Sequence, residues 1–203
     1  MMRRLRFLRR DQRGATLVEA TIVFPLVLVL TFGLVEFGYA LWQYHAVEKA
    51  TAAGARFLAA RHGVLGADAL STELYTASVP DCFVSSSQPL GTPCSQVAGA
   101  TGWSQTCSGA GGGSCSAGVM SSLLTQMQTY APFLTASNVA VQFKGTGMGF
   151  IGRGRSIPLI TVKTTGLTYN FVVMNNLLGL GPITMPPFST TLPAEDQREG
   201  VPS

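Results

Sequence analysis

The sequence predicts an α+β protein with a long N-terminal helix, whose first half crosses a membrane, and a small exported head built around an antiparallel sheet. Three observations support this fold class. An unbroken apolar run follows an arginine-rich start, helical periodicity continues to about residue 62, and alternating apolar and polar residues return after residue 119. The 203 residues therefore divide into an anchor and one small domain, which excludes a large multidomain enzyme.

Residues 1–14 form a basic leader. They carry six arginines against one acid, Asp11, for a local net charge of +5. Because the whole chain has a formal charge of +4, the remaining residues have a net charge of −1. Binding to nucleic acid needs clustered cations on the folded part, so no nucleic-acid partner is expected.

Residues 15–36 are predicted to form a transmembrane helix. Between Ala15 and Val35 the only charged residue is Glu19, and this length of helix covers about 30 Å, the thickness of the hydrocarbon core. The arginines place the N-terminus in the cytoplasm and the rest of the chain outside it. A buried core helix and a cleaved secretory signal peptide ending near Gly38-Tyr39-Ala40 are less favoured, because the run is too long for either and lacks a polar stripe.

Glu19 is the residue of this run that calls for an explanation. A carboxylate inside a membrane helix is costly and often marks function. A carboxylate near the start of a helix can also simply complement the helix dipole and reach the headgroups. The residue alone leaves these two explanations equal.

The residues around Glu19 favour function. An arginine-rich leader, Gly14, then Ala15-Thr16-Leu17-Val18-Glu19 and an apolar stretch resembles the class III signal sequence of type IV pilins and pseudopilins. The resemblance implies that a prepilin peptidase cuts between Gly14 and Ala15, which leaves Glu19 as the fifth residue of the mature chain. Its carboxylate could then pair with the new α-ammonium of a neighbouring subunit and set the register between subunits.

A closer resemblance extends over about a quarter of the chain, to TadE-like proteins, pseudopilins of the tight-adherence (Tad/Flp) pilus. The matching positions are Arg13-Gly14, Val18-Glu19-Ala20, Pro25, Glu36-Phe37-Gly38, Ala50 and Gly54-Ala55-Arg56. Ala20 departs from the pattern, since the family often has phenylalanine there. The resemblance implies a pilin-like fold and, as partners, other pseudopilins, the major pilin, the prepilin peptidase, the inner-membrane assembly platform and membrane lipid.

Residues 37–62 are predicted to extend the helix beyond the membrane. Ala46, Ala50 and Gly54 recur every four residues, and such a row of small residues lets another helix approach closely. It serves equally well to pack the helix on its own head. Pro25 is expected to kink or loosen the membrane part. The candidate helix-packing positions are Pro25, Glu36, Gly38, Ala46, Ala50, Gly54 and Arg56.

Residues 63–118 are predicted to be a Ser/Gly/Cys-rich loop region. All four cysteines lie there: Cys82, Cys94, Cys107 and Cys115. Their spacing lacks a zinc-type pair and no histidine is close, so no metal is expected. An exported compartment favours two disulfides. Three connectivities are possible, and proximity in sequence favours Cys82–Cys94 with Cys107–Cys115.

Residues 119–192 are predicted to form the α+β head, and residues 193–203 a solvated tail. A helix is expected from Met120 to about Leu134, and strands are expected at 139–144, 160–163 and 167–173. The last two strands read as a hairpin turning at 164–166. Residues 183–192, interrupted by Pro186-Pro187, read as an edge strand.

An enzyme is not expected. Residues 147–152 match G-x-G-x-x-G, but a strand rather than a helix follows and no acid lies between Asp81 and Glu195, so a glycine-rich connection is predicted rather than a nucleotide site. Both histidines, His45 and His62, precede the head, which excludes a Ser-His-Asp or Cys-His arrangement there. No cofactor is expected.

The function that the resemblance implies is that of a minor pseudopilin, which enters or initiates a Tad-type pilus through its N-terminal helix. Its expected location is the bacterial inner membrane, as a single-pass protein with a cytoplasmic N-terminus, periplasmic head and possible incorporation in the pilus. The alternative is an uncleaved, membrane-anchored binding module with an exported head.

Overall fold

The computed structural model describes residues 12–60, 89–98, 101–109, 117–151 and 157–194. They belong to two compact units. One unit consists of Met1–Trp42 and Thr168–Ile183, and the other of Gln43–Leu167 and Thr184–Ser203. One long helix, Gln12–Ala60, contributes to both units.

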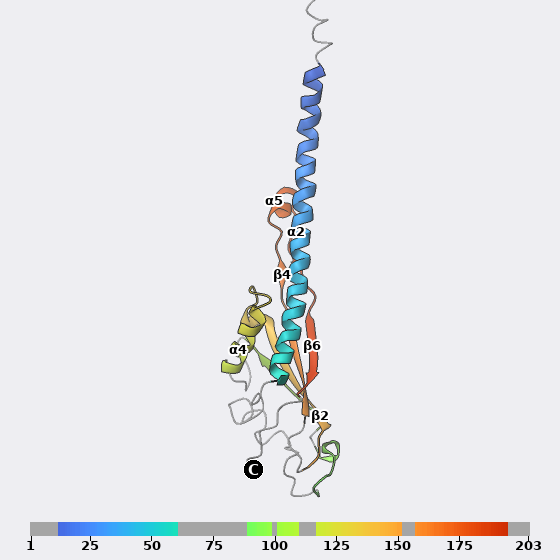
Figure 1. The fold of residues 1–203 in the computed structure, drawn as a ribbon, viewed down its shortest axis with the longest axis vertical. Helices are drawn as coiled ribbons and strands as arrows, with labels where there is room; N and C mark the ends of the chain where they lie inside the picture. The colour runs from blue at the N-terminus through green and yellow to red at the C-terminus, as the bar shows by residue number, and fades with distance from the viewer. Residues whose placement is uncertain (1–11, 61–88, 99–100, 110–116, 152–156, 195–203) are drawn as a thin grey trace, which may run out of the picture. The chain divides into compact units, whose positions relative to one another are not determined.

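Helix α2, Gln12–Ala60, is 49 residues long and continues through Pro25 (Figure 1). Its portion from Thr16 is long and apolar enough to cross a membrane, with a mean hydropathy of 2.3 in its most apolar window. Side chains from Leu17 to Phe32 are almost all exposed, which is the pattern of a helix that has no protein core around it. An N-terminal helix with these properties fits a single-pass membrane protein.

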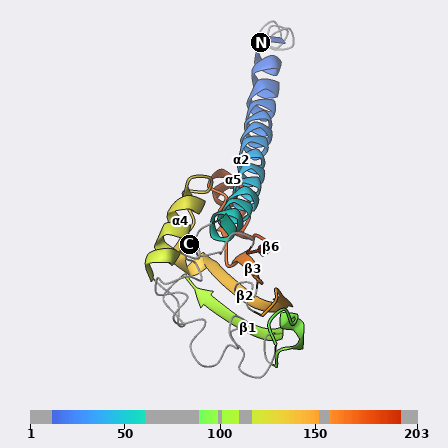
Figure 2. The ribbon, with the colours of Figure 1, turned by 60° about the horizontal axis from the view of Figure 1, so that its bottom comes forward.

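The second unit is built on a four-stranded antiparallel sheet in the order β1-β2-β3-β6, and Figure 2 shows its first three strands side by side. The chain therefore combines a long helix with an antiparallel sheet, as predicted. The strands are β1 Thr101–Ser108, β2 Val139–Met148, β3 Ile157–Thr164 and β6 Phe188–Pro193.

The core of this unit lies on one face of the sheet. Alternate residues of β2 and β3 are buried, and the register pairs Val141 with Val162 and Phe143 with Ile160. Helix α4, Ala117–Gln128, buries Met120, Leu123 and Met127. The opposite face of the sheet is polar, with the Lys163 ammonium donating to Oε1 of Gln142 at 2.9 Å. This alternation is what makes two half-buried strands recognisable in the sequence.

One strand lies where a loop was predicted. β1 and the short 3₁₀ helix η1, Cys94–Gln96, both fall inside residues 63–118. β1 is an edge strand rich in Ser, Thr and Gln, and its order comes from backbone pairing with β2. An edge strand needs little apolar content of its own, so composition alone did not identify it.

The predicted hairpin between β3 and a strand at 167–173 is wrong. β3 pairs with β2 and β6, and the chain after Gly166 forms only the short strand β4, Thr168–Tyr169, which pairs with β5, Ile183–Thr184. Between β4 and β5 lies a six-residue helix, α5, Val173–Leu178. The apolar alternation at 167–173 was therefore real, but its aromatic residues pack on α2 (below) and not in the main sheet. Of the single edge strand predicted at 183–192, the second part is present as β6 at the edge of the main sheet, whereas Ile183–Thr184 belong to β5 in the separate two-stranded sheet.

The G-x-G-x-x-G string starts inside β2 and is a strand end, as predicted. Gly147 has φ +72°, and a β-carbon there would lie 2.8 Å from the Cα of Ser95 in η1. Glycine at this position thus permits close approach of two backbones. Gly152, which completes the string, lies outside the described residues, as do residues 153–156, most of the leader, the helix end at His62, Cys82, Cys115 and the tail from residue 195.

Candidate functional site

The N-terminal candidate residues lie on the first turns of α2. A β-carbon added at Gly14 would meet nothing within 4 Å, and the Glu19 side chain is exposed. Thr16, Leu17, Val18 and Ala20 are exposed as well, so this end of the helix has no covering layer in the described part of the chain. Ala15 is helical. An exposed carboxylate on an exposed apolar helix is free to meet a group from another molecule.

A second carboxylate on the same helix, Glu36, has a different environment. Its side chain is buried, with 9% exposure. Oε1 accepts hydrogen bonds from the backbone N–H groups of Val172 at 2.8 Å and Val173 at 2.6 Å, and Oε2 accepts one from Met174 at 3.0 Å. These N–H groups open helix α5, and the first N–H groups of any helix lack partners within it. Glu36 therefore caps α5 from a position 136 residues earlier in the chain.

Glycine lets α5 approach this part of α2. A β-carbon at Gly33, one turn before Glu36, would lie 3.0 Å from the terminal methyl of Met174. Figure 1 shows α5 beside α2. Gly33 and Glu36 thus form one docking position on the same face of α2, where one residue provides room and the other provides acceptors.

An aromatic cluster continues this contact along the same helix. Phe37 and Phe171 have ring centroids 5.1 Å apart, and Tyr39 lies 6.1 Å from Tyr169. The Tyr169 hydroxyl donates to the backbone carbonyl of Glu36 at 3.2 Å. Burial, and after it the negative charge of Glu36, raises the pKa of Tyr169, so its hydroxyl stays protonated and able to donate.

The row of small residues lies in the other unit, where it is buried. Ala46, Ala50 and Gly54 are covered, and a β-carbon at Gly54 would lie 3.0 Å from Met127 of α4. The Thr51 hydroxyl, in the same part of α2, is 3.2 Å from the Thr164 hydroxyl of β3. Of the two readings of this row, the structure shows packing on the protein's own head. Arg56 and Gly38 are exposed.

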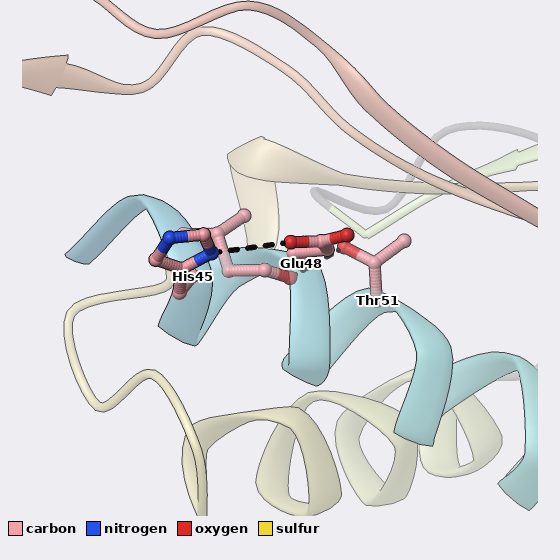
Figure 3. A network of polar contacts seen from close by, with 4 residues as sticks. His45, Glu48 and Thr51 are labelled. Atoms are coloured by element: carbon pink, nitrogen blue, oxygen red, sulfur yellow. Dashed lines mark hydrogen bonds and ion pairs between the residues drawn. The ribbon is translucent and has the colours of Figure 1, made fainter. Parts of the chain in front are cut away.

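His45 lies on the surface of α2. Its Nδ1 is 3.4 Å from Oε2 of Glu48, and Figure 3 shows the two side chains pointing toward one another. Both are well exposed, at 64% and 63%, so the pair contributes little to stability.

Cys94 and Cys107 are both buried. Each of them takes part in a disulfide. The other two cysteines lie outside the described residues, so the pairing Cys82–Cys94 with Cys107–Cys115 stays a prediction. Among the described residues, no group of three or more His, Cys, Asp or Glu side chains could hold a metal ion.

The Glu36 cap is the feature that sequence reasoning missed. Glu36 was singled out only as a helix-packing position, because its partners lie far away in sequence and are backbone groups, which carry no side-chain identity. One observation could have found it: from Ala20 to Tyr44, Glu36 is the only charged side chain. A lone carboxylate at the end of an apolar run needs a specific set of donors.

Residues 14–56 match the family model described as TadE-like protein. The matched segment contains Gly14, Glu19, Pro25, Glu36 and Gly54, and it ends at Arg56. No curated protein and no solved structure matches the chain.

Proposed function

We propose that this chain, whose residues 14–56 match the TadE-like family model, is a minor pseudopilin of a Tad-type pilus. In this role it enters or initiates a Tad-type pilus through α2. The observation that carries the proposal is the family match at residues 14–56, which coincides with a helix that is exposed and apolar over its first half.

The role proposed for Glu19 is to set the register between subunits. A prepilin peptidase would cut between Gly14 and Ala15 and free an α-ammonium at Ala15. The exposed carboxylate of Glu19 on a neighbouring subunit would pair with that ammonium inside the bilayer, where an unpaired charge is costly. The other partners under this proposal are further pseudopilins, the major pilin and the inner-membrane assembly platform.

Processing is tested by the intact mass of the protein isolated from its native host. A mature form that begins at Ala15 supports the pseudopilin. A form that keeps the arginines supports the alternative, an uncleaved single-pass anchor whose exported head binds a ligand. The Gly14→Val variant should block the cut, because glycine has no β-carbon and a valine side chain would clash with a peptidase that accepts only the bare backbone at this position.

The register role is tested by replacing Glu19 with Ala in the native host. Membrane insertion should be unchanged, since the substitution makes the span more apolar, while recovery of the protein in sheared pili should fall. Glu48→Ala is the matched control, because Glu48 is an exposed carboxylate on the same helix beyond the predicted membrane. Normal incorporation of the Glu19→Ala protein would contradict the register role without affecting the family assignment.

The head is proposed to be structural and not catalytic. Its described sheet has an apolar face covered by helices and a polar face with hydrogen-bonded Gln, Lys and Thr side chains. A TadE-like N-terminus on such a domain fits a subunit whose head is carried on a filament or membrane rather than an exported enzyme.

A further inference from the structure

The segment from Val172 to Ile183 exposes an unusual amount of apolar surface. The side chains of Val172, Leu177, Leu178, Leu180 and Ile183 are between 38% and 68% exposed. No charged residue occurs between Lys163 and Glu195. A patch of this kind on a protein in water normally marks a contact with a partner or a membrane.

The depth of this segment follows from its contacts with α2. Met174 lies against Gly33, and residues 172–174 bond to Glu36. If the span starts at Ala15, Gly33 lies about 27 Å along the helix, still within a hydrocarbon core of about 30 Å. Helix α5 is therefore beside the last turns of the membrane span, on its exported side.

A stacked aromatic pair on α2 independently indicates where the hydrocarbon region ends. Tyr39 and Trp42 stack with ring centroids 5.4 Å apart and are each 52% exposed. Tyr and Trp gather where the hydrocarbon meets the headgroups. This pair lies one to two turns beyond Glu36 on α2, so the boundary they mark is farther from the N-terminus than the position of α5.

The Glu36 carboxylate provides the hydrogen-bond acceptors that the first backbone N–H groups of α5 need at this depth. Water is absent from the hydrocarbon region, so each backbone N–H there needs a protein acceptor. The Glu36 carboxylate accepts all three N–H groups from Val172 to Met174. At the C-terminal end of α5, the Gly179 N–H donates to the Asn175 carbonyl. The Asn176 side-chain amide donates to the Val172 carbonyl at the N-terminal end.

We propose that residues 172–183 form a second membrane-contacting element, a short helical loop that lies in the exported leaflet beside α2 and presents its leucines to lipid acyl chains. The occupant of the apolar surface is lipid, because that surface continues the exposed apolar surface of the span itself. The protein thus holds the membrane by one crossing and one re-entrant contact. The proposal rests on the span and not on the pilus role.

The test uses full-length protein in lipid nanodiscs, with tryptophan as the reporter. Leu178→Trp is compared with Val23→Trp in the span and with Leu90→Trp, an exposed leucine of the other unit. Each variant also carries Trp42→Phe, because Trp42 would itself report the interface. Fluorescence is measured in phosphatidylcholine with and without bromine on the acyl chains, and the signal of the Trp42→Phe parent is subtracted.

Leu178→Trp and Val23→Trp should both be quenched by about twofold in the brominated lipid, since both would touch acyl chains, while Leu90→Trp should keep its intensity. Leu180→Trp is the second reporter if the first variant does not fold. Two results would overturn the proposal. One is an unquenched, red-shifted emission that iodide quenches, which places the loop in water. The other is an unquenched, blue-shifted emission with crosslinks between copies, which makes a second protein chain the occupant.

Discussion

Glu36 shows how a single side chain can hold two distant segments together. It contributes two oxygens to three backbone donors, so the contact depends on a carboxylate and not only on a polar group of similar size. Hydrogen bonds to a charged acceptor are stronger than neutral ones, and losing one partner leaves the others unsatisfied.

Replacing Glu36 with Gln should loosen α5 while leaving α2 intact. The amide keeps one acceptor oxygen but turns an NH₂ group toward a backbone donor. We expect amide hydrogen exchange at residues 172–174 to become about tenfold faster in the detergent-solubilised protein. Glu48→Gln, on the exposed face of the same helix, should change nothing at these amides. Unchanged exchange in Glu36→Gln would show that α5 is held by packing alone.

The glycines of α2 differ in what surrounds them, and Gly54 is the most constrained by packing. A β-carbon there would lie within 3.1 Å of both Met127 and Leu123, so Gly54→Leu should lower the free energy of unfolding by about 1–3 kcal/mol. Thermal denaturation in detergent measures this. Gly38→Leu is the control, since a β-carbon at Gly38 would meet nothing within 4 Å. Equal melting temperatures for the two variants would contradict the packing of α4 on Gly54.

At the scale of elements, a helix or strand could be predicted from the sequence when its own residues had a clear apolar periodicity. The long helix, α4, β2 and β3 were predicted because their apolar residues keep the period of a buried helix or strand over several turns or pairs. β1 was missed because Thr101, Ser104 and Gln105 give no apolar alternation, and its order depends on its neighbour. The β3 hairpin was wrong because Tyr169 and Phe171 have the right period but pack on Tyr39 and Phe37.

The packing of β2 against η1 depends on Gly147, so substitution of this glycine tests that packing. Gly147→Ala places a methyl group 2.5 Å from the Thr101 side chain and 2.8 Å from the Ser95 backbone, at a φ of +72°. Gly102→Ala has a similar φ, +82°, but open space around it. We expect Gly102→Ala to cost about 1 kcal/mol of unfolding free energy and Gly147→Ala about 2 kcal/mol more, measured by chemical denaturation. Equal costs would mean that backbone conformation alone requires glycine there.

At the scale of the whole molecule, the segment that matches the family model lies entirely within one helix, α2. The matched residues 14–56 cover the predicted span, the Glu36 cap and the row packed on α4, so one helix carries both the predicted span and the packing with the head. The candidate residues at the N-terminus stay predictions, and the sequence suggested them because the motif and its position before an apolar helix occur together there. The Glu36 cap was not, because its donors are backbone groups of a loop whose fold the sequence did not reveal.

The charge distribution of the whole chain provides the last prediction, on orientation. The leader holds a net +5 and the rest of the chain −1, so the positive-inside rule acts through six side chains: Arg3, Arg4, Arg6, Arg9, Arg10 and Arg13. Changing all six to Ala should reduce export of the head several-fold, measured as protease accessibility of a C-terminal tag in spheroplasts. Changing all six to Lys keeps the charge and should preserve export. Undiminished export of the Ala variant would show that the apolar length of α2, and not the leader charge, sets the orientation, whereas loss of export in the Lys variant would show that arginine itself is recognised.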